Sequence, residues 1–157
     1  MIKYILCLLL IPLTSFSQDV TFTNKLVGET LKLFYANVAV KKYIPIVVEN
    51  LGVESFHGYC MMTQVNQERV ILNQSFYAKY KNNKQAIEYL IIHELGHCLL
   101  GYEHDPELVI VNGLLLPKSI MYPENIGMED WYIRNRLYYL KEYFCRTSKE
   151  YPICKQK

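Results

Sequence analysis

The sequence is poor in histidine and carries almost no excess charge of either sign. Only four of its 157 residues are histidine, and 17 basic residues stand against 15 acidic ones, for a formal net charge of +2. A chain so close to neutral gives no electrostatic reason to expect nucleic acid or an anionic membrane surface as a partner. Internal repeats and low-complexity segments are also lacking. The function therefore has to be sought in a few particular residues.

The sequence also lacks an apolar run long enough to span a membrane. A short run follows Lys3, and Ser15 and Ser17 then place small residues where a signal peptidase reads. We therefore expect residues 1–17 to be a secretory signal peptide that is cleaved after Ser17. Cys7 lies inside the apolar run instead of following it, so a lipid anchor is not expected. The mature protein would be secreted or periplasmic.

Removal of residues 1–17 leaves residues 18–157, enough for one compact domain and too few for two. We expect this single domain to be a monomer. Four of the five cysteines remain, and an even number in an exported chain predicts two disulfides, for which three pairings are possible. Cys145 and Cys154 are near neighbours at the end of the chain, which favours their pairing and leaves Cys60 to pair with Cys98.

Three of the four histidines fall in one stretch, from His93 to Asp105. His93 and His97 are four residues apart, so on a helix they lie on the same face and can bind one Zn²⁺. Glu94 lies one residue further round the helix, close enough to deprotonate a water on the metal without being a ligand. Zinc lowers the pKa of such a water to about 7. The spacing therefore predicts a catalytic zinc site.

Beyond these residues, the stretch resembles the zinc signature of the metzincin metallopeptidases, in which a glycine and a third histidine follow His-Glu-x-x-His. These enzymes also have a methionine turn downstream, and residues 119–123, Ser-Ile-Met-Tyr-Pro, resemble the turn of the matrixin branch. The resemblance implies that Met121 forms an apolar floor beneath the histidines and is not a ligand. It implies no tyrosine ligand, because Pro123 stands where some other branches have that tyrosine.

The chain departs from the family signature by one added residue. Gly101 follows His97 by four residues and His104 follows it by seven, one more than the family spacing in each case. A regular helix would place Glu103 at the family's third-ligand position. We favour His104, because Gly101 can adopt the left-handed conformation that ends a helix, and its spacing to His104 is the family's own. The added residue would then be absorbed before Gly101 as a longer or wider last helical turn.

The whole chain predicts an α/β fold: a small mixed, mostly parallel sheet packed against two helices, with a short helical part at the C-terminus. The resemblance implies a metzincin-like zincin domain. Periodicity and β-branched runs predict a helix from Lys25 to about Tyr43, strands at Ile44–Val48, Phe56–Met62 and Gln67–Asn73, the metal helix Lys84–Leu100, an irregular apolar loop at Glu107–Lys118, and a last helix at Glu129–Phe144. By the resemblance, Phe56–Met62 is the candidate edge strand for binding an extended substrate. Asn73 begins a glycosylation sequon.

Together these features predict a secreted zinc-dependent endopeptidase, with Zn²⁺ as its cofactor and a peptide or protein as its substrate. His93, His97 and His104 would hold the metal. Glu94 would take the proton from the attacking water and pass it to the leaving amine.

Two alternatives remain open. A gluzincin-like peptidase would take a carboxylate, from Glu103 or Asp105, as the third ligand. A non-catalytic secreted zinc protein would use the site for stability or for binding a partner. The presence of Glu94 argues against the second alternative, because a structural site needs no base and usually closes zinc with a fourth protein ligand.

Overall fold

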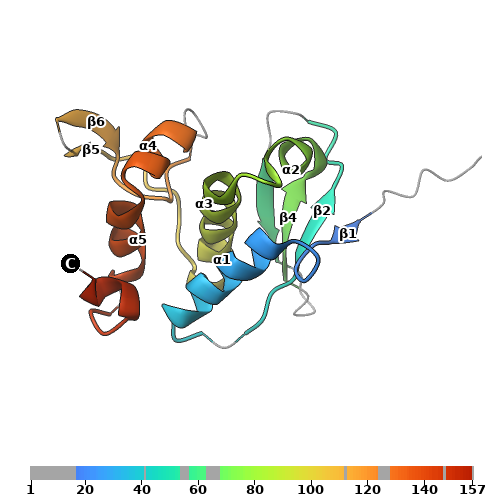
Figure 1. The fold of residues 1–157 in the computed structure, drawn as a ribbon, viewed down its shortest axis with the longest axis horizontal. Helices are drawn as coiled ribbons and strands as arrows, with labels where there is room; N and C mark the ends of the chain where they lie inside the picture. The colour runs from blue at the N-terminus through green and yellow to red at the C-terminus, as the bar shows by residue number, and fades with distance from the viewer. Residues whose placement is uncertain are drawn as a thin grey trace, which may run out of the picture.

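The computed structural model describes residues 17–40, 42–53, 57–62, 68–111, 113–123, 128–146 and 148–156. The elements, shown in Figure 1, are β1 (Gln18–Asp19), α1 (Lys25–Ala36), β2 (Ile46–Glu49), β3 (Gly58–Met61), β4 (Arg69–Asn73), α2 (Gln74–Tyr80), α3 (Lys84–Leu95), the π-helix η1 (Gly96–Leu100), β5 (Leu108–Val111), β6 (Leu114–Pro117), α4 (Met128–Arg134), α5 (Arg136–Phe144) and the 3-10 helix η2 (Pro152–Lys155). Residues 1–16 of the predicted signal peptide lie outside the described residues, as do Phe56 and Gln67. Within the described part of the chain, no helix combines the length and the apolar character needed to cross a membrane.

The sheet is mixed, with the strand order β1-β2-β4-β3. β2 and β4 pair in parallel, with Val47 opposite Ile71, whereas β1 and β3 pair antiparallel on the two sides of them. The α/β class and the mixed sheet are confirmed, but the mostly parallel pairing that we predicted is wrong for the described strands. Parallel pairing needs a long connection, and the chain between β2 and β4, which includes β3, supplies one.

β2 begins two residues later than the predicted strand Ile44–Val48. Pro45 has no N–H to give to a neighbouring strand, although its carbonyl accepts a hydrogen bond from the Val70 amide at 3.0 Å. The amide of Ile46 donates to the Thr21 hydroxyl at 2.8 Å, which ties the start of β2 to the segment before α1. From there the strand runs regularly to Glu49.

α1 and α3 lie on the same side of the sheet (Figure 1) and pack against each other. Alternate residues of β2 and β4 reach the same core as the buried faces of the two helices: Val27, Leu31, Phe34, Ile46, Val48, Val70, Leu72, Ile87, Leu90 and Ile91. α1 ends at Ala36, well before the predicted Tyr43. The side chain of Asn37 donates to the carbonyl of Leu33 at 2.9 Å, and such a local bond competes with continuation of the helix.

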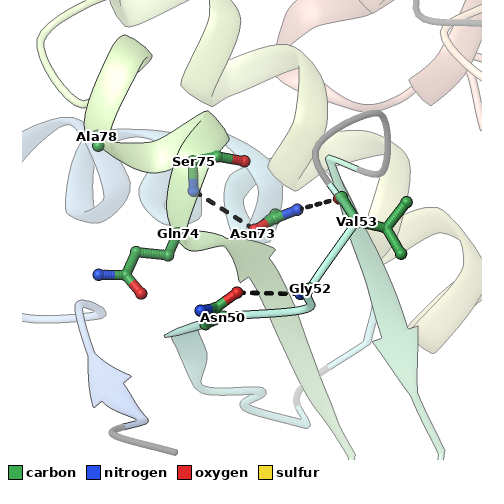
Figure 2. Close-up of a pocket in the computed structure, with 7 residues that line it drawn as sticks. All are labelled: Asn50, Gly52, Val53, Asn73, Gln74, Ser75 and Ala78. Atoms are coloured by element: carbon green, nitrogen blue, oxygen red, sulfur yellow. Dashed lines mark hydrogen bonds between the residues drawn. The ribbon is translucent and has the colours of Figure 1, made fainter.

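A helix that we did not predict, α2, follows β4 directly. The side-chain oxygen of Asn73 accepts the amide of Ser75 at 3.4 Å, and its nitrogen donates to the carbonyl of Val53 at 2.7 Å (Figure 2). Asn73 is 2% exposed, beside a cavity of about 460 Å³. The sequon asparagine is therefore engaged at both ends of its amide and is inaccessible to a glycosylating enzyme in the folded chain.

The apolar segment that we predicted as an irregular loop is a hairpin. β5 and β6 pair antiparallel, with Val111 opposite Leu114, and Gly113 between them has a φ of 80°. An Asn-Gly pair between two apolar runs is a strong hairpin signal, because both turn residues tolerate positive φ. The sequence contained this signal at residues 112 and 113, and the loop prediction overlooked it.

The predicted last helix is two helices. α4 and α5 are separated by Asn135, which has a φ of −122° and whose side-chain nitrogen donates to the carbonyl of Trp131 at 3.1 Å. Asparagine competes in this way for the carbonyls of the preceding turn. The hydrophobic spacing alone did not show the break.

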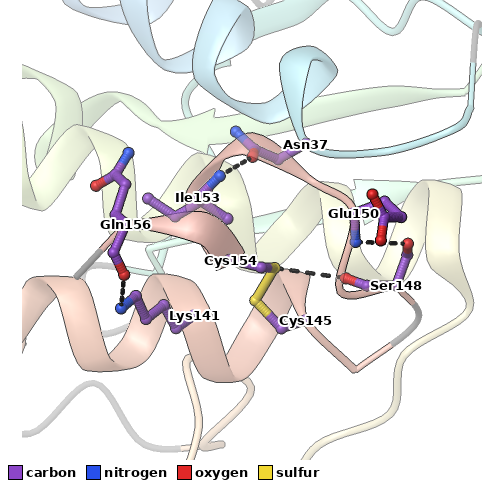
Figure 3. The surroundings of a disulfide bond; sticks show 8 residues. All are labelled: Asn37, Lys141, Cys145, Ser148, Glu150, Ile153, Cys154 and Gln156. Atoms are coloured by element: carbon purple, nitrogen blue, oxygen red, sulfur yellow. Dashed lines mark hydrogen bonds between the residues drawn. A yellow bond between two sulfur atoms is a disulfide. The ribbon is translucent and has the colours of Figure 1, made fainter.

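Both predicted disulfides are confirmed. Cys60–Cys98 joins β3 to η1, and Cys145–Cys154 joins the end of α5 to η2. Close to the second one, the amide of Ile153 donates to the side-chain oxygen of Asn37 at 2.9 Å, so the tail is docked on the end of α1 (Figure 3). Disulfides persist in oxidising compartments, which agrees with the predicted export.

Candidate metal centre

The helix that carries the first two histidines is central to the domain. Every residue of α3 from Ala86 to Leu95 is buried. The helix begins at Asn83, whose side-chain oxygen accepts hydrogen bonds from the amides of Gln85 and Ala86, both at 3.1 Å. Because α3 is packed on all sides, it offers a rigid support for metal-binding side chains.

One buried charge further fixes α3. Glu88 is 1% exposed, and its carboxylate accepts two hydrogen bonds from the guanidinium of Arg136 on α5, at 2.5 and 2.8 Å. The hydroxyl of Tyr132 on α4 donates to the same carboxylate at 2.6 Å. A buried carboxylate is tolerated only when it is paired in this way, so Glu88 joins three helices around the site.

The last turn of the metal helix is wide. Residues Gly96–Leu100 form the π-helix η1, and the amide of Gly101 bonds back to the carbonyl of Gly96. Gly101 has a φ of 63°, the left-handed conformation that ends a helix. A π-helical turn holds one residue more than an α-helical turn, so the added residue of the zinc signature is accommodated there. The predicted wider last turn is confirmed.

This wide turn brings His104 back to the other two histidines. The Nε2 atom of His97 lies 3.2 Å from that of His93 and 3.2 Å from that of His104, and the third Nε2 separation is 3.3 Å. The three rings form a cluster that could hold a metal ion. Glu103, the alternative third ligand, is exposed and is not a member of this cluster, which among the described residues consists of the three histidines.

The Nδ1 atoms of the first two histidines face backbone carbonyls. Nδ1 of His93 lies 2.8 Å from the oxygen of Ile120, and Nδ1 of His97 lies 2.6 Å from the oxygen of Tyr102. Since a carbonyl oxygen only accepts, each Nδ1 carries the proton and each Nε2 presents a lone pair. A tetrahedral zinc with Zn–N bonds of 2.0–2.1 Å sets its ligand nitrogens about 3.3 Å apart. The cluster therefore fits an ion such as Zn²⁺.

Burial favours the uncharged form of His93 and of His104. The pKa of His93 is lowered to about 4, mainly by burial and to a lesser extent by the neighbouring His97 and His104, while the hydrogen bond to Ile120 opposes this shift. Burial and the neighbouring His97 also lower the pKa of His104. Nε2 lone pairs that converge on one point repel one another, and a cation between them relieves that repulsion.

Glu94 lines the same cleft as the three histidines. It is 5% exposed, and burial raises the pKa of its carboxyl to about 7, while a hydrogen bond from the backbone of Cys60 opposes this rise. A carboxyl group with a pKa near neutrality can both accept and return a proton at physiological pH.

The cleft has a volume of about 350 Å³ and lies between the metal helix and the edge strand β3. Its lining residues are His57, Gly58, Tyr59, Cys60, Met62, His93, Glu94, His97, His104 and Pro123. His57 lies just before β3 and packs against Phe76 with ring centroids 5.0 Å apart. The Cys60–Cys98 disulfide fastens the edge strand directly to the residue after His97.

The resemblance places Met121 beneath the histidines, and in the structure Met121 packs against η1 at Gly96. It is fully buried, its amide donates to the Ser119 hydroxyl at 3.0 Å, and its carbonyl accepts the Asp105 amide at 2.8 Å. A Cβ atom added to Gly96 would meet the Met121 sulfur at 2.9 Å. Met121 is therefore packed directly against the turn of helix between His93 and His97.

Comparison with protein-family models, with curated proteins and with solved structures gives no match. The function is therefore inferred from the geometry of the three-histidine cluster and its cleft.

Three contributions to this site come from backbone atoms and were not predicted. The carbonyls of Ile120 and Tyr102 hold the two helical histidines, and the backbone of Cys60 bonds to Glu94. A backbone group is the same at every residue, so no side-chain pattern could have identified these three. The only signal in the sequence was the methionine turn itself, which placed Ile120 close to the histidines.

Gly96→Ala is expected to destabilise the protein by about 1–3 kcal/mol, the usual cost of forcing a methyl group into a packed core. The added Cβ would lie 2.6 Å from the Tyr143 hydroxyl oxygen and 2.9 Å from the Met121 sulfur, and both side chains are fully buried. Urea unfolding monitored by circular dichroism measures the effect. Gly28→Ala in α1 is the control, because its Cβ would meet nothing within 4 Å. It should stabilise α1 by about 0.5–1 kcal/mol, and equal stability of Gly96→Ala and wild type would contradict the packing described.

Proposed function

We propose that this protein is a secreted zinc-dependent endopeptidase of the metzincin type, with residues 18–157 as its single, monomeric domain. The observation that carries the proposal is the convergence of three Nε2 atoms at 3.2–3.3 Å, with Glu94 in the same cleft. In this proposal His93, His97 and His104 hold Zn²⁺. The site would leave the fourth position of a tetrahedral ion open, as catalytic zinc sites do.

Zn²⁺ held by His93, His97 and His104 would supply Lewis-acid chemistry for attack of a water on the scissile carbonyl. Glu94 accepts a proton from the attacking water and then donates it to the nitrogen of the leaving amine as the peptide bond breaks. The Cys60 backbone holds the carboxylate in place for both transfers. Met121 supports the helix turn from below and takes no part in proton transfer.

The position of β3 supports a peptide as the substrate. β3 is the last strand on its side of the sheet and borders the cleft, so an extended peptide can add to it as a further strand. Backbone pairing of this kind holds a substrate with little regard to its side chains. Specificity would then come from side chains such as Tyr59, Met62 and Pro123 that line the cleft.

A gluzincin-like site with a carboxylate ligand is less well supported. The carboxylate of Asp105 lies 3.4 Å from the guanidinium of Arg146 and 3.8 Å from the ammonium of Lys118, which neutralise it away from the metal site. A non-catalytic zinc protein is also less well supported, since the cluster of described residues supplies three ligands and a structural site usually has four.

The test is to purify the mature protein, measure its zinc content, and incubate it with a denatured protein and with a peptide library. We expect about one zinc per chain, cleavage of both substrates, and loss of cleavage with a chelator that zinc restores. A protein that binds zinc but cleaves neither substrate would favour the non-catalytic alternative. A protein that binds no zinc would overturn the proposal altogether.

A further inference from the structure

Two loops support the three histidines from behind. The first, residues 102–105, supplies the Tyr102 carbonyl that holds His97, and it also carries His104. The second, residues 119–121, supplies the Ile120 carbonyl that holds His93. The Asp105 amide bonds to the Met121 carbonyl at 2.8 Å, so the two loops are joined by their backbones at this point. The relative position of the two loops therefore determines how all three imidazole rings are oriented.

One side chain, Arg146, contacts both loops. It lies just after α5, and one terminal nitrogen of its guanidinium donates to the Ser119 hydroxyl at 2.7 Å and lies 3.4 Å from the Asp105 carboxylate. The same guanidinium lies over the ring of Tyr102, with its central carbon 5.4 Å from the ring centroid. On its other side it pairs with Glu142 of α5, whose carboxylate accepts its Nε at 2.7 Å.

Arg146 contacts residues whose displacement would move the two loops that hold the histidines. Ser119 is fully buried, and its hydroxyl already accepts the Met121 amide at 3.0 Å, so it fixes the start of the methionine turn. The carboxylates of Asp105 and Glu142 would repel each other without the cation between them. A guanidinium is planar and can serve several acceptors at once, which a lysine ammonium on a flexible stem does less well.

We propose that Arg146 is a positioning residue for the metal centre, which holds the loop of His104 and the methionine turn in the register that the three Nε2 atoms need. The proposal rests on the proposed function only in taking the three histidines as the zinc ligands. Arg146 itself contacts neither metal nor substrate. Its effect passes through Asp105, Tyr102 and Ser119 to the rings.

The test measures the metal directly. Zinc affinity is determined by competition with a chromogenic chelator, and the ligand geometry by the absorption spectrum of the Co²⁺-substituted protein. Arg146→Gln should weaken zinc binding by about 10- to 100-fold, the usual cost of removing an outer support of metal ligands, and should alter the Co²⁺ spectrum. Arg146→Lys should recover part of the loss. Arg134→Gln, which removes an exposed arginine from α4, should change neither measurement.

A second variant tests whether Arg146 acts through Asp105. Asp105→Asn should also weaken zinc binding, and the double variant with Arg146→Gln should lose less than the sum of the two single losses, because the two residues act through one contact. If Arg146→Gln does not fold, Asp105→Asn and Arg146→Lys carry the test. Wild-type zinc affinity and an unchanged Co²⁺ spectrum in the folded Arg146 and Asp105 variants would overturn the proposal.

The failure of this proposal can be told apart from that of the proposed function. Tight zinc binding without peptide cleavage in the wild type overturns the endopeptidase and leaves the role of Arg146 intact. Peptide cleavage with undiminished zinc affinity in the Arg146 variants overturns the positioning role and leaves the endopeptidase intact. If His93→Ala does not weaken zinc binding, the zinc lies elsewhere and both proposals fall.

Discussion

Glu94→Gln is expected to reduce peptide cleavage by about 10²- to 10⁴-fold while zinc remains bound, because general acid–base catalysis contributes on that scale. Glutamine has nearly the same size and its side-chain oxygen can still accept the Cys60 backbone hydrogen bond that glutamate accepts. It cannot take a proton from the attacking water. The measurements are kcat/KM on a fluorogenic peptide and the zinc content of the same preparation.

Glu103→Gln provides the matched control for this variant. It makes the same chemical change on an exposed residue a few positions from the third histidine, outside the cluster. Its kcat/KM should remain within about twofold of wild type, since surface changes away from a site have small effects. Near-normal cleavage by Glu94→Gln would refute the assignment of Glu94 as the base.

His104→Ala is expected to lose most of the zinc affinity and nearly all of the activity. Structural zinc sites with four ligands bind with about 10–16 kcal/mol, so one ligand accounts for about 3 kcal/mol, or roughly a 10²-fold loss of affinity. The side chain of His104 is exposed, so its removal leaves no cavity in the core. Circular dichroism should therefore show an intact fold beside the loss of metal.

The comparison of His104→Ala with Glu103→Gln decides between the two candidate third ligands. A helix that continued regularly would bring Glu103 towards the metal, but Leu100 would then need the left-handed conformation, which costs about 1–2 kcal/mol for a residue with a Cβ. In the structure the π-helix ends at Gly101 instead. If the Glu103 variant is the one that loses zinc, the third ligand is a carboxylate and the metzincin assignment fails.

The features of the site that could be predicted are those that depend on the identity and spacing of particular side chains. The spacing of His93 and His97 requires a helix, and Gly101 marks its end, so a wider last turn followed from the position of one glycine. Cysteine pairing followed from proximity along the chain and from elimination. In each case the residue type restricts the local structure to a few possibilities, so the sequence alone was enough to predict it.

The parts that escaped prediction depend on contacts between distant segments. The mostly parallel sheet was wrong because strand direction depends on which strands become neighbours, and periodicity does not encode this. Hydrophobic spacing did not reveal the break at Asn135 either, because that break depends on one side-chain bond to the Trp131 carbonyl. Nothing in the sequence distinguishes Arg146, since an isolated arginine belongs to no motif.

The hydrogen bond from Ile153 to Asn37 has a consequence for the order of folding. It joins residues 116 positions apart, so the residue that caps the end of α1 is tied to η2. Closing so large a loop costs conformational entropy before any contact offsets it, and such pairings form late. The segments that support the histidines, up to Arg146, also follow α3 in the sequence. The contact between the end of α1 and η2 therefore forms only after synthesis has passed residue 153.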